Sequence, residues 1–181
     1  MSRTILTIGI LVMGVATTVR AAGTGKKVDP TKMTCEEFVA LGKDAKPRVV
    51  AWLDGYSKAG KATKEEVAIL PVSSDVAVVV ATCAETPKQS LWDKIRAKLP
   101  GGKKTVPDPT KMTCEEFVGL EKDIQPEVAY WLDGYTKGAK GGKTETGAAG
   151  EVALDSDVLV VVEECRNAPK ASLWEKIKKK L

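Results

Sequence analysis

Four cysteines are the most reactive side chains of this 181-residue chain, and they fall into two similarly spaced pairs. Cys35 and Cys83 are 48 residues apart, and Cys114 and Cys165 are 51 residues apart. Thiols can form disulfides, bind metals or carry redox chemistry. The sequence has no CxxC pair and no His, which argues against a redox or metal site. We therefore expect disulfides, no metal and no cofactor.

The absence of histidine excludes several classes of function. A Ser-His-Asp or Cys-His nucleophile, a His metal site and a His-based pH switch are all ruled out. No paired carboxylates, activated nucleophile or glycine-rich phosphate loop stands out, so we do not expect an enzyme. The net charge is +4, with both signs spread along the chain, and this balance does not point to nucleic acid as a partner.

Most of the chain consists of two tandem copies of one sequence repeat. The segment DPTKMTCEEFV occupies residues 29–39 and again residues 108–118, an offset of 79. Trp52 and Trp131 share that offset. A repeat of this identity is a strong signal for two similar domains. We expect repeat 1 at residues 29–99, an exposed Pro/Gly/Lys-rich linker at 100–107, and repeat 2 at 108–181.

Each repeat carries its own cysteine pair, which favours a disulfide within each repeat. Four cysteines allow three connectivities, and only the within-repeat one makes each copy self-contained. Closing a loop of this length stabilises a fold by about 4 kcal/mol in the chain-entropy model. A domain of about 70 residues has a small core and benefits from such a cross-link.

The pattern of each repeat is mainly helical. Thr34 and Glu37 have the spacing of a capping box at a helix start, and Thr113 and Glu116 repeat it. Residues 74–83 are ambiguous, because their β-branched run favours a strand while their Ser-Asp start favours a capped helix. The end of each repeat has the pattern of a Lys-rich amphipathic helix. The second helix should present one apolar face per repeat: Val49, Trp52, Leu53 and Tyr56 in repeat 1, and Val128, Trp131, Leu132 and Tyr135 in repeat 2.

The N-terminal segment has the features of a signal peptide. Arg3 supplies positive charge, residues 5–15 form an apolar run, and Val19 and Ala21 are small residues where a signal peptidase reads the chain. We expect a signal peptide at residues 1–21; the alternative is an uncleaved membrane anchor. Its removal takes away two arginines and leaves 26 Lys and Arg against 24 Asp and Glu, a charge of +2. The mature protein should be soluble and exported to an oxidising compartment, without stable membrane association.

The order of these motifs resembles the HdeA/HdeB-type periplasmic acid-stress chaperones. The resemblance covers nearly all of both repeats, and the cysteine spacing is its most specific part. It implies an all-α fold of two tandem small four-helix HdeA-like domains, each with one internal disulfide, and it makes the ambiguous segment a helix. The matching residues are 33–38, Lys46-Pro47, Cys83 and 92–95 in repeat 1, and 112–117, Gln125-Pro126, Cys165 and 174–177 in repeat 2.

Members of that family are folded dimers at neutral pH that come apart and partly unfold in acid, and then bind other periplasmic proteins. The resemblance therefore implies a periplasmic acid-stress holdase chaperone whose partners are acid-unfolded periplasmic proteins. The composition agrees, because 24 Asp and Glu would lose their charge in strong acid and the chain would repel itself. One alternative is a constitutive periplasmic structural or protein-binding module without acid switching. Another is a small-ligand carrier, which needs a closed apolar pocket in each repeat.

Two groups of residues are candidates for the functional site. Whether the repeats pair with each other as a pseudo-dimer, or with other chains as a homodimer, stays open. Asp54-Gly55 and Asp133-Gly134 also repeat, without an assigned chemistry. The expected client-binding or dimer surface, which is also the expected core of the resting protein, is Val49, Val50, Trp52, Leu53, Tyr56, Val128, Trp131, Leu132 and Tyr135. The expected pH sensors are the carboxylates at the helix starts, Glu36, Glu37, Glu115 and Glu116.

Overall fold

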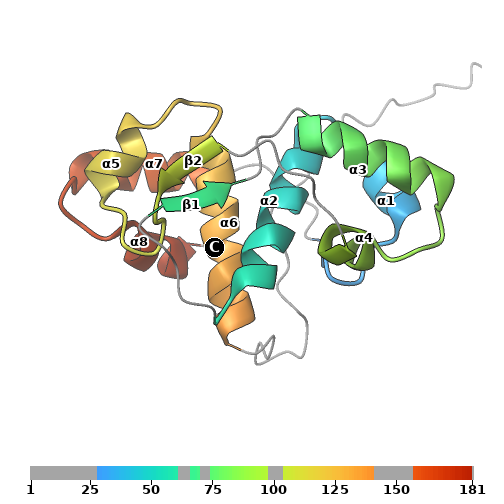
Figure 1. Ribbon diagram of the computed structural model, residues 1–181. Helices are drawn as coiled ribbons and strands as arrows, with labels where there is room; N and C mark the ends of the chain where they lie inside the picture. Colours follow the sequence, from blue (N-terminus) through green and yellow to red (C-terminus); the bar gives the residue numbers. More distant parts are fainter. Residues whose placement is uncertain (1–27, 61–65, 70–73, 98–103, 141–156, 181) are drawn as a thin grey trace, which may run out of the picture.

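The computed structural model describes most of both repeats and not the N-terminal segment. The signal peptide expected at residues 1–21 lies outside the described residues. The structure describes residues 28–60, 66–69, 74–97, 104–140 and 157–180 (Figure 1).

Within the described residues each repeat contributes four helices, and the fold is mostly helical as expected. Repeat 1 forms α1 (Cys35–Ala40), α2 (Ala45–Lys58), α3 (Ser74–Glu85) and α4 (Leu91–Ala97). Repeat 2 forms α5 (Cys114–Gly119), α6 (Gln125–Ala139), α7 (Asp157–Asn167) and α8 (Leu173–Lys180).

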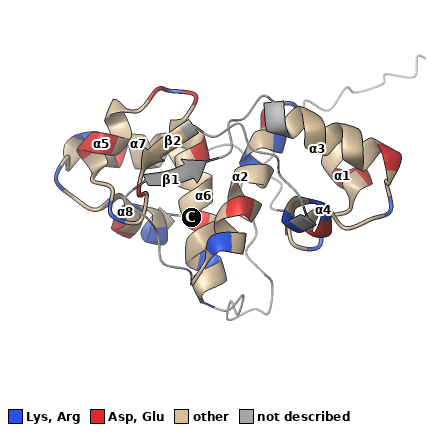
Figure 2. Cartoon of the chain, viewed as in Figure 1, with Lys and Arg blue, Asp and Glu red and all other residues tan. Residues whose placement is uncertain are grey.

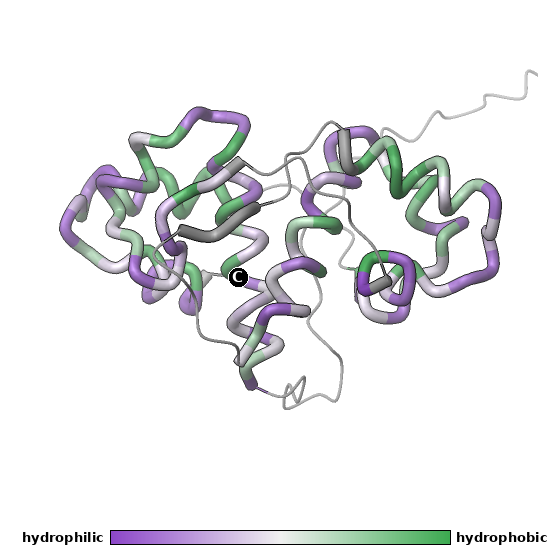
Figure 3. Tube along the Cα trace, viewed as in Figure 1, coloured by the Kyte–Doolittle hydropathy of each residue, from purple (hydrophilic) through white to green (hydrophobic). Residues whose placement is uncertain are grey.

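The ambiguous β-branched segment is a helix, α3, as the resemblance implied. Val79 and Cys83 are both buried and lie four residues apart, which places them on one side of a helix. The tertiary contacts of these two residues override the strand propensity of their neighbours. α3 is apolar along much of its length, as its green colour shows in Figure 3.

Capping boxes start the first helix of both repeats, as the sequence predicts. The hydroxyl of Thr34 accepts a hydrogen bond from the Glu37 amide, and the Glu37 carboxylate accepts one from the Thr34 amide. Thr113 and Glu116 make the same two bonds. These bonds satisfy amide groups that the helix itself leaves unpaired.

One disulfide closes each repeat, and both expected pairings are confirmed. Cys35 bonds to Cys83 and so ties α1 to α3, and Cys114 bonds to Cys165 and so ties α5 to α7. All four cysteines are buried. Each repeat therefore has its own cross-link inside its own core.

A short antiparallel sheet pairs a strand of repeat 1 with the end of the expected linker, in which Thr105 and Pro107 are exposed and Val106 is buried. β1 (Glu66–Ile69) of repeat 1 pairs with β2 (Lys104–Pro107), so that Glu66 lies opposite Pro107. Val106 is only 4% exposed and belongs to the core of repeat 2. The strand pairing and the burial of Val106 attach residues 104–107, half of the expected linker, to β1 and to the core of repeat 2.

α2 and α6 lie side by side at the centre of the molecule and separate the other helices of the two repeats (Figure 1). Repeat 1 packs on one side of this pair and repeat 2 on the other. Positive and negative segments are interleaved along both repeats (Figure 2), in keeping with a low net charge. The two repeats therefore pack against each other within one chain, through α2 and α6.

Candidate functional site at the α2–α6 interface

The central helices are buried around their whole circumference over several turns. Residues 49–55 of α2 are all buried, and so are residues 127–136 of α6. A helix that is buried on every side needs a neighbour on every side. The core of the same repeat covers one side of each helix, and the opposite repeat covers the other.

Two glycines allow the backbones of α2 and α6 to touch. A Cβ atom on Gly55 would overlap the main-chain carbonyl oxygen of Trp131. A Cβ atom on Gly134 would overlap the carbonyl oxygen of Trp52 in the same way. The missing side chain of glycine is therefore required at both positions.

Two hydrogen bonds cross this contact in a reciprocal pattern. The indole Nε1 of Trp52 donates to Oδ2 of Asp133 over 2.7 Å, and Nε1 of Trp131 donates to Oδ2 of Asp54 over 2.9 Å. Asp54 is 6% exposed and Asp133 is 4% exposed. We call these four residues the Trp–Asp latch, because each repeat supplies one donor and one acceptor to the other.

The indole rings of the Trp–Asp latch are held by aromatic neighbours in their own repeats. The ring of Trp52 stacks on Tyr56, which meets the edge of Trp92, with centroid distances of 5.1 and 5.4 Å. Repeat 2 has the equivalent arrangement of Trp131, Tyr135 and Trp174. Each Trp thus contributes its ring to one core and its N–H group to the opposite repeat.

A lysine one turn along the same helix neutralises each buried carboxylate. Lys58 Nζ lies 2.7 Å from Oδ2 of Asp54, and Lys137 Nζ lies 2.8 Å from Oδ2 of Asp133. The Lys58 side chain is 36% exposed and the Lys137 side chain is 16% exposed. A buried carboxylate is tolerated when it is paired and hydrogen-bonded in this way.

The two cores are also joined by side chains that cross between the repeats. Tyr130 of α6 is 1% exposed and belongs to the core of repeat 1, where the guanidinium of Arg48 lies 5.7 Å from the centre of its ring. Ala59 packs against the core of repeat 2. Val158 of α7 packs against both cores. These contacts make the interface continuous with the interior of each repeat.

The residues expected to form a client-binding or dimer surface are buried or half-buried in this structure. Trp52 and Trp131 reach the opposite repeat through the Trp–Asp latch, and the main chain of Tyr56 lies close to Gly134. The side chain of Tyr56 is half-buried. The other expected surface residues are buried: Val49, Val50, Leu53, Val128, Leu132 and Tyr135.

The carboxylates expected to sense pH lie exposed at the starts of α1 and α5, away from the α2–α6 interface. Hydrogen bonds from the amide and hydroxyl of Thr113 hold the pKa of Glu116 below its usual value. Glu37 accepts the equivalent bonds from Thr34. Glu36 and Glu115 are exposed neighbours in the first turns. A sensing role for these four carboxylates stays a prediction.

The sequence reasoning missed the part played by the Asp-Gly pairs. The segment WLDGY occurs at residues 52–56 and again at residues 131–135. Within it, the glycine lets the backbones of α2 and α6 come into contact, and the aspartate accepts a hydrogen bond from the Trp of the opposite repeat. A carboxylate repeated inside an otherwise apolar helix, next to a repeated glycine, is the signal that would have found this contact.

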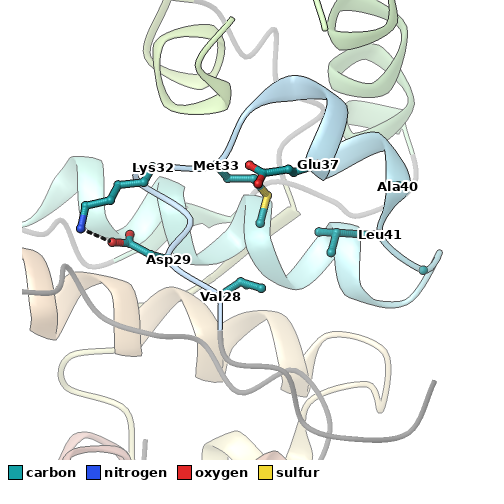
Figure 4. A pocket seen from close by; sticks show the side chains of 8 residues that line it. Val28, Asp29, Lys32, Met33, Glu37, Ala40 and Leu41 are labelled. Atoms are coloured by element: carbon teal, nitrogen blue, oxygen red, sulfur yellow. Dashed lines mark ion pairs between the residues drawn. The ribbon is translucent and has the colours of Figure 1, made fainter. Parts of the chain in front are cut away.

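A surface groove lies beside α1, and it differs between the repeats. In repeat 1 it measures about 590 Å³ and is bordered by the Asp29–Lys32 ion pair, Met33 and Leu41 (Figure 4). The matching groove at Asp108 and Met112 measures about 160 Å³. Neither of these two open grooves is the closed apolar pocket that a small-ligand carrier would need.

The described residues contain neither a metal-binding cluster nor a membrane-spanning helix. No group of His, Cys, Asp or Glu side chains in those residues has an arrangement suited to a metal ion. None of the described helices has the length and apolar character to cross a membrane.

The chain has clear relatives. It matches the HdeA/HdeB family over residues 3–93 and again over residues 98–175. It is 34% identical over 74 residues to proteins named probable acid stress chaperone HdeA from Brucella ovis, Brucella canis and Brucella abortus. The match covers 41% of this chain and 63% of each relative, so the chain spans less than two thirds of their length. No solved structure gives a significant match.

Proposed function

This chain belongs to the HdeA/HdeB family, and we propose that it is a periplasmic acid-stress holdase chaperone. At neutral pH the repeats are closed against each other, and in acid they separate, loosen and bind unfolding client proteins. The names of the relatives support the chaperone role. We propose no enzymatic activity.

The observation that carries this proposal is the apolar and aromatic surface that is buried between the repeats. Trp52 and Trp131 are fully buried in the closed form, and Tyr130 lies inside the core of the opposite repeat. Separation of α2 from α6 would uncover these side chains together. A contiguous apolar surface of this kind binds the exposed apolar segments of unfolded proteins.

Some apolar surface is already exposed before opening. Val78 of α3 is 44% exposed, and Leu159 and Val160 of α7 are 75% and 43% exposed. The offset of 82 between the two cysteine-bearing helices makes Val78 and Val160 equivalent positions. These residues would extend the client surface outward from the separated helices.

The disulfides fit a chaperone that loosens without unravelling. A disulfide is stable in acid, and each one closes a loop within a single repeat. The repeats can therefore separate while each keeps its first and third helices joined. Protonated carboxylates and unchanged Lys and Arg would give the opened chain a high positive charge, which keeps its complexes with clients soluble.

A client aggregation assay tests the proposal. An acid-unfolded client is incubated at about pH 2.5 with and without the oxidised chain and is then returned to neutral pH. We expect less light scattering and more soluble client with the chain present. An equal amount of a disulfide-bonded protein unrelated in sequence is the control. Equal client losses with the chain and with the control would contradict the proposed function.

One observation favours the alternative of a constitutive binding module. The β1–β2 sheet links the repeats through main-chain hydrogen bonds that do not depend on a carboxylate. A chain that stays closed at about pH 2.5 and binds one defined partner at neutral pH would fit this alternative.

A further inference from the structure

We propose that Asp54 and Asp133 are the acid sensor of the chain, and that their protonation releases Trp131 and Trp52 and opens the α2–α6 interface. This inference rests on the proposed acid-activated function and names the groups that regulate it. In this inference the principal sensor is the pair of buried carboxylates on the interface itself, and not the exposed capping glutamates.

The closed form is built around the ionised state of both aspartates. One oxygen of each carboxylate, Oδ2, accepts from an indole N–H of the opposite repeat and also lies within 2.8 Å of a lysine Nζ. Hydrogen bonds to an ionised acceptor are shorter and stronger than those between neutral groups. The distances across the Trp–Asp latch, 2.7 and 2.9 Å, are in the range for such bonds.

Protonation changes both partners of each aspartate together. The neutral acid is a weaker acceptor for the indole N–H group. Lys58 and Lys137 lose the negative charge beside them. The loss is greater at Lys137, whose side chain is only 16% exposed and is less able to take up water in exchange. Acid therefore favours the open form, in which both groups are hydrated.

Several other charged groups on α2, α6 and the helices that pack against them have contacts of their own. On α2, Lys46 donates to the carbonyl of Leu41 and Arg48 lies over the ring of Tyr130. Glu127 and Tyr130 lie nearer the start of α6. On α3, α4, α7 and α8, the charged side chains that the structure describes are Glu85 on α3, Asp93, Lys94 and Arg96 on α4, Glu163, Glu164 and Arg166 on α7, and Glu175, Lys176, Lys178 and Lys179 on α8. Among them, Arg96 lies over Trp92, Arg166 pairs with Glu163, Lys176 with Glu164, and Lys178 with Glu175.

The sequence offers a matched control for a test of the two aspartates. Asp44 and Asp123 are also separated by the repeat offset, precede α2 and α6, and are exposed. The double variants Asp54→Asn, Asp133→Asn and Asp44→Asn, Asp123→Asn therefore change the net charge equally. Only the first removes charge from the Trp–Asp latch.

Opening is measured as the fall in sedimentation coefficient and the red shift of tryptophan emission between pH 7 and about pH 2. We expect the midpoint for Asp54→Asn, Asp133→Asn to lie higher than that of the unaltered chain by about one pH unit or more, up to opening at neutral pH. The number of protons taken up during the transition, read from its steepness against pH, should also fall by up to about two. The Asp44→Asn, Asp123→Asn variant should open at the same pH midpoint as the unaltered chain. Equal midpoints in all three proteins, or an unaltered chain that never opens, would overturn the inference.

A second variant covers the case in which the aspartate variant loses its helices. Trp52→Phe, Trp131→Phe keeps an aromatic ring at both positions and both Asp–Lys pairs but removes the two indole N–H donors of the Trp–Asp latch. We expect a raised midpoint, read by sedimentation, with helical content retained at neutral pH. An unchanged midpoint would contradict the proposed role of the Trp–Asp latch.

The client assay separates this inference from the proposed function. Shifted opening without client protection would support Asp54 and Asp133 as sensors and contradict the chaperone role. Client protection with unshifted opening would support the chaperone role and contradict these sensors.

Discussion

The indole nitrogen of Trp52 lies 2.7 Å from Oδ2 of Asp133, a residue 81 positions later in the chain and in the opposite repeat. Trp131 and Asp54 repeat the same contact in the opposite sense. The two halves of one chain thus hold each other as two subunits of a symmetric dimer would.

Gly134→Ala should destabilise the closed form. The new Cβ would overlap the carbonyl oxygen of Trp52, which is main chain and cannot turn away. We expect a loss of about 1–3 kcal/mol in the free energy of unfolding at neutral pH, measured by urea denaturation. Gly119→Ala is the control, because a Cβ there meets nothing within 4 Å. Equal unfolding midpoints for the two variants would show that α2 and α6 do not touch in solution.

Cys35→Ser, Cys83→Ser should lower the stability of repeat 1 by about 4 kcal/mol at neutral pH, because the unfolded chain regains the freedom of a long loop. The same change at Cys114 and Cys165 should have a similar effect on repeat 2. Hydrogen exchange followed repeat by repeat gives the measurement. If both variants lose protection equally in both repeats, the disulfides do not act within single repeats as the structure shows.

Glu116→Gln should reduce stability at neutral pH and have no effect in strong acid. The folded-state pKa of Glu116 lies below its usual value of 4.5, because the amide and hydroxyl of Thr113 donate to its carboxylate. The ionised side chain therefore contributes stability above pH 4.5, and this contribution is lost as the pH falls through the lower folded value.

The effect of Glu116→Gln should be less than about 1 kcal/mol, since the group is exposed. Urea denaturation at several pH values measures it, with the exposed neighbour variant Glu115→Gln as control. A loss of stability that persists unchanged in strong acid would rule out this account of the cap.

Tyr130→Ala should destabilise repeat 1, although Tyr130 belongs to repeat 2 in the sequence. The ring is 1% exposed within the core of repeat 1, and its removal would leave a cavity there. We expect a cost of about 3 kcal/mol and a loss of hydrogen-exchange protection in α2 and α4. Leu159→Ala, at a site that is 75% exposed, should have little effect. Loss of protection confined to α8 of repeat 2 would contradict the observed packing.

Much of this fold could be predicted from local patterns. The capping boxes at Thr34 and Thr113 act over three residues, and the cysteine pairs recur in each copy, so both could be inferred without knowledge of the packing. The α3 helix could not be inferred from propensity, because its valines favour a strand and only the resemblance corrected this.

The contacts between the repeats needed the structure. Nothing local to Glu66–Ile69 indicates that this short strand pairs with Lys104–Pro107, which lies well over 30 positions away. A single Asp within an apolar helix is usually taken as solvent-facing. Asp54 and Asp133 are buried instead, because each meets a donor from the opposite repeat.

Sedimentation velocity of the oxidised mature chain, at neutral pH and at about pH 2.5, tests the central claim most directly when run at two protein concentrations. The account predicts one compact species at neutral pH and one expanded species in acid, with the same coefficients at both concentrations, since both halves of the interface belong to one chain. A compact species that does not change with pH would contradict it, and so would an acid transition whose midpoint moves with protein concentration.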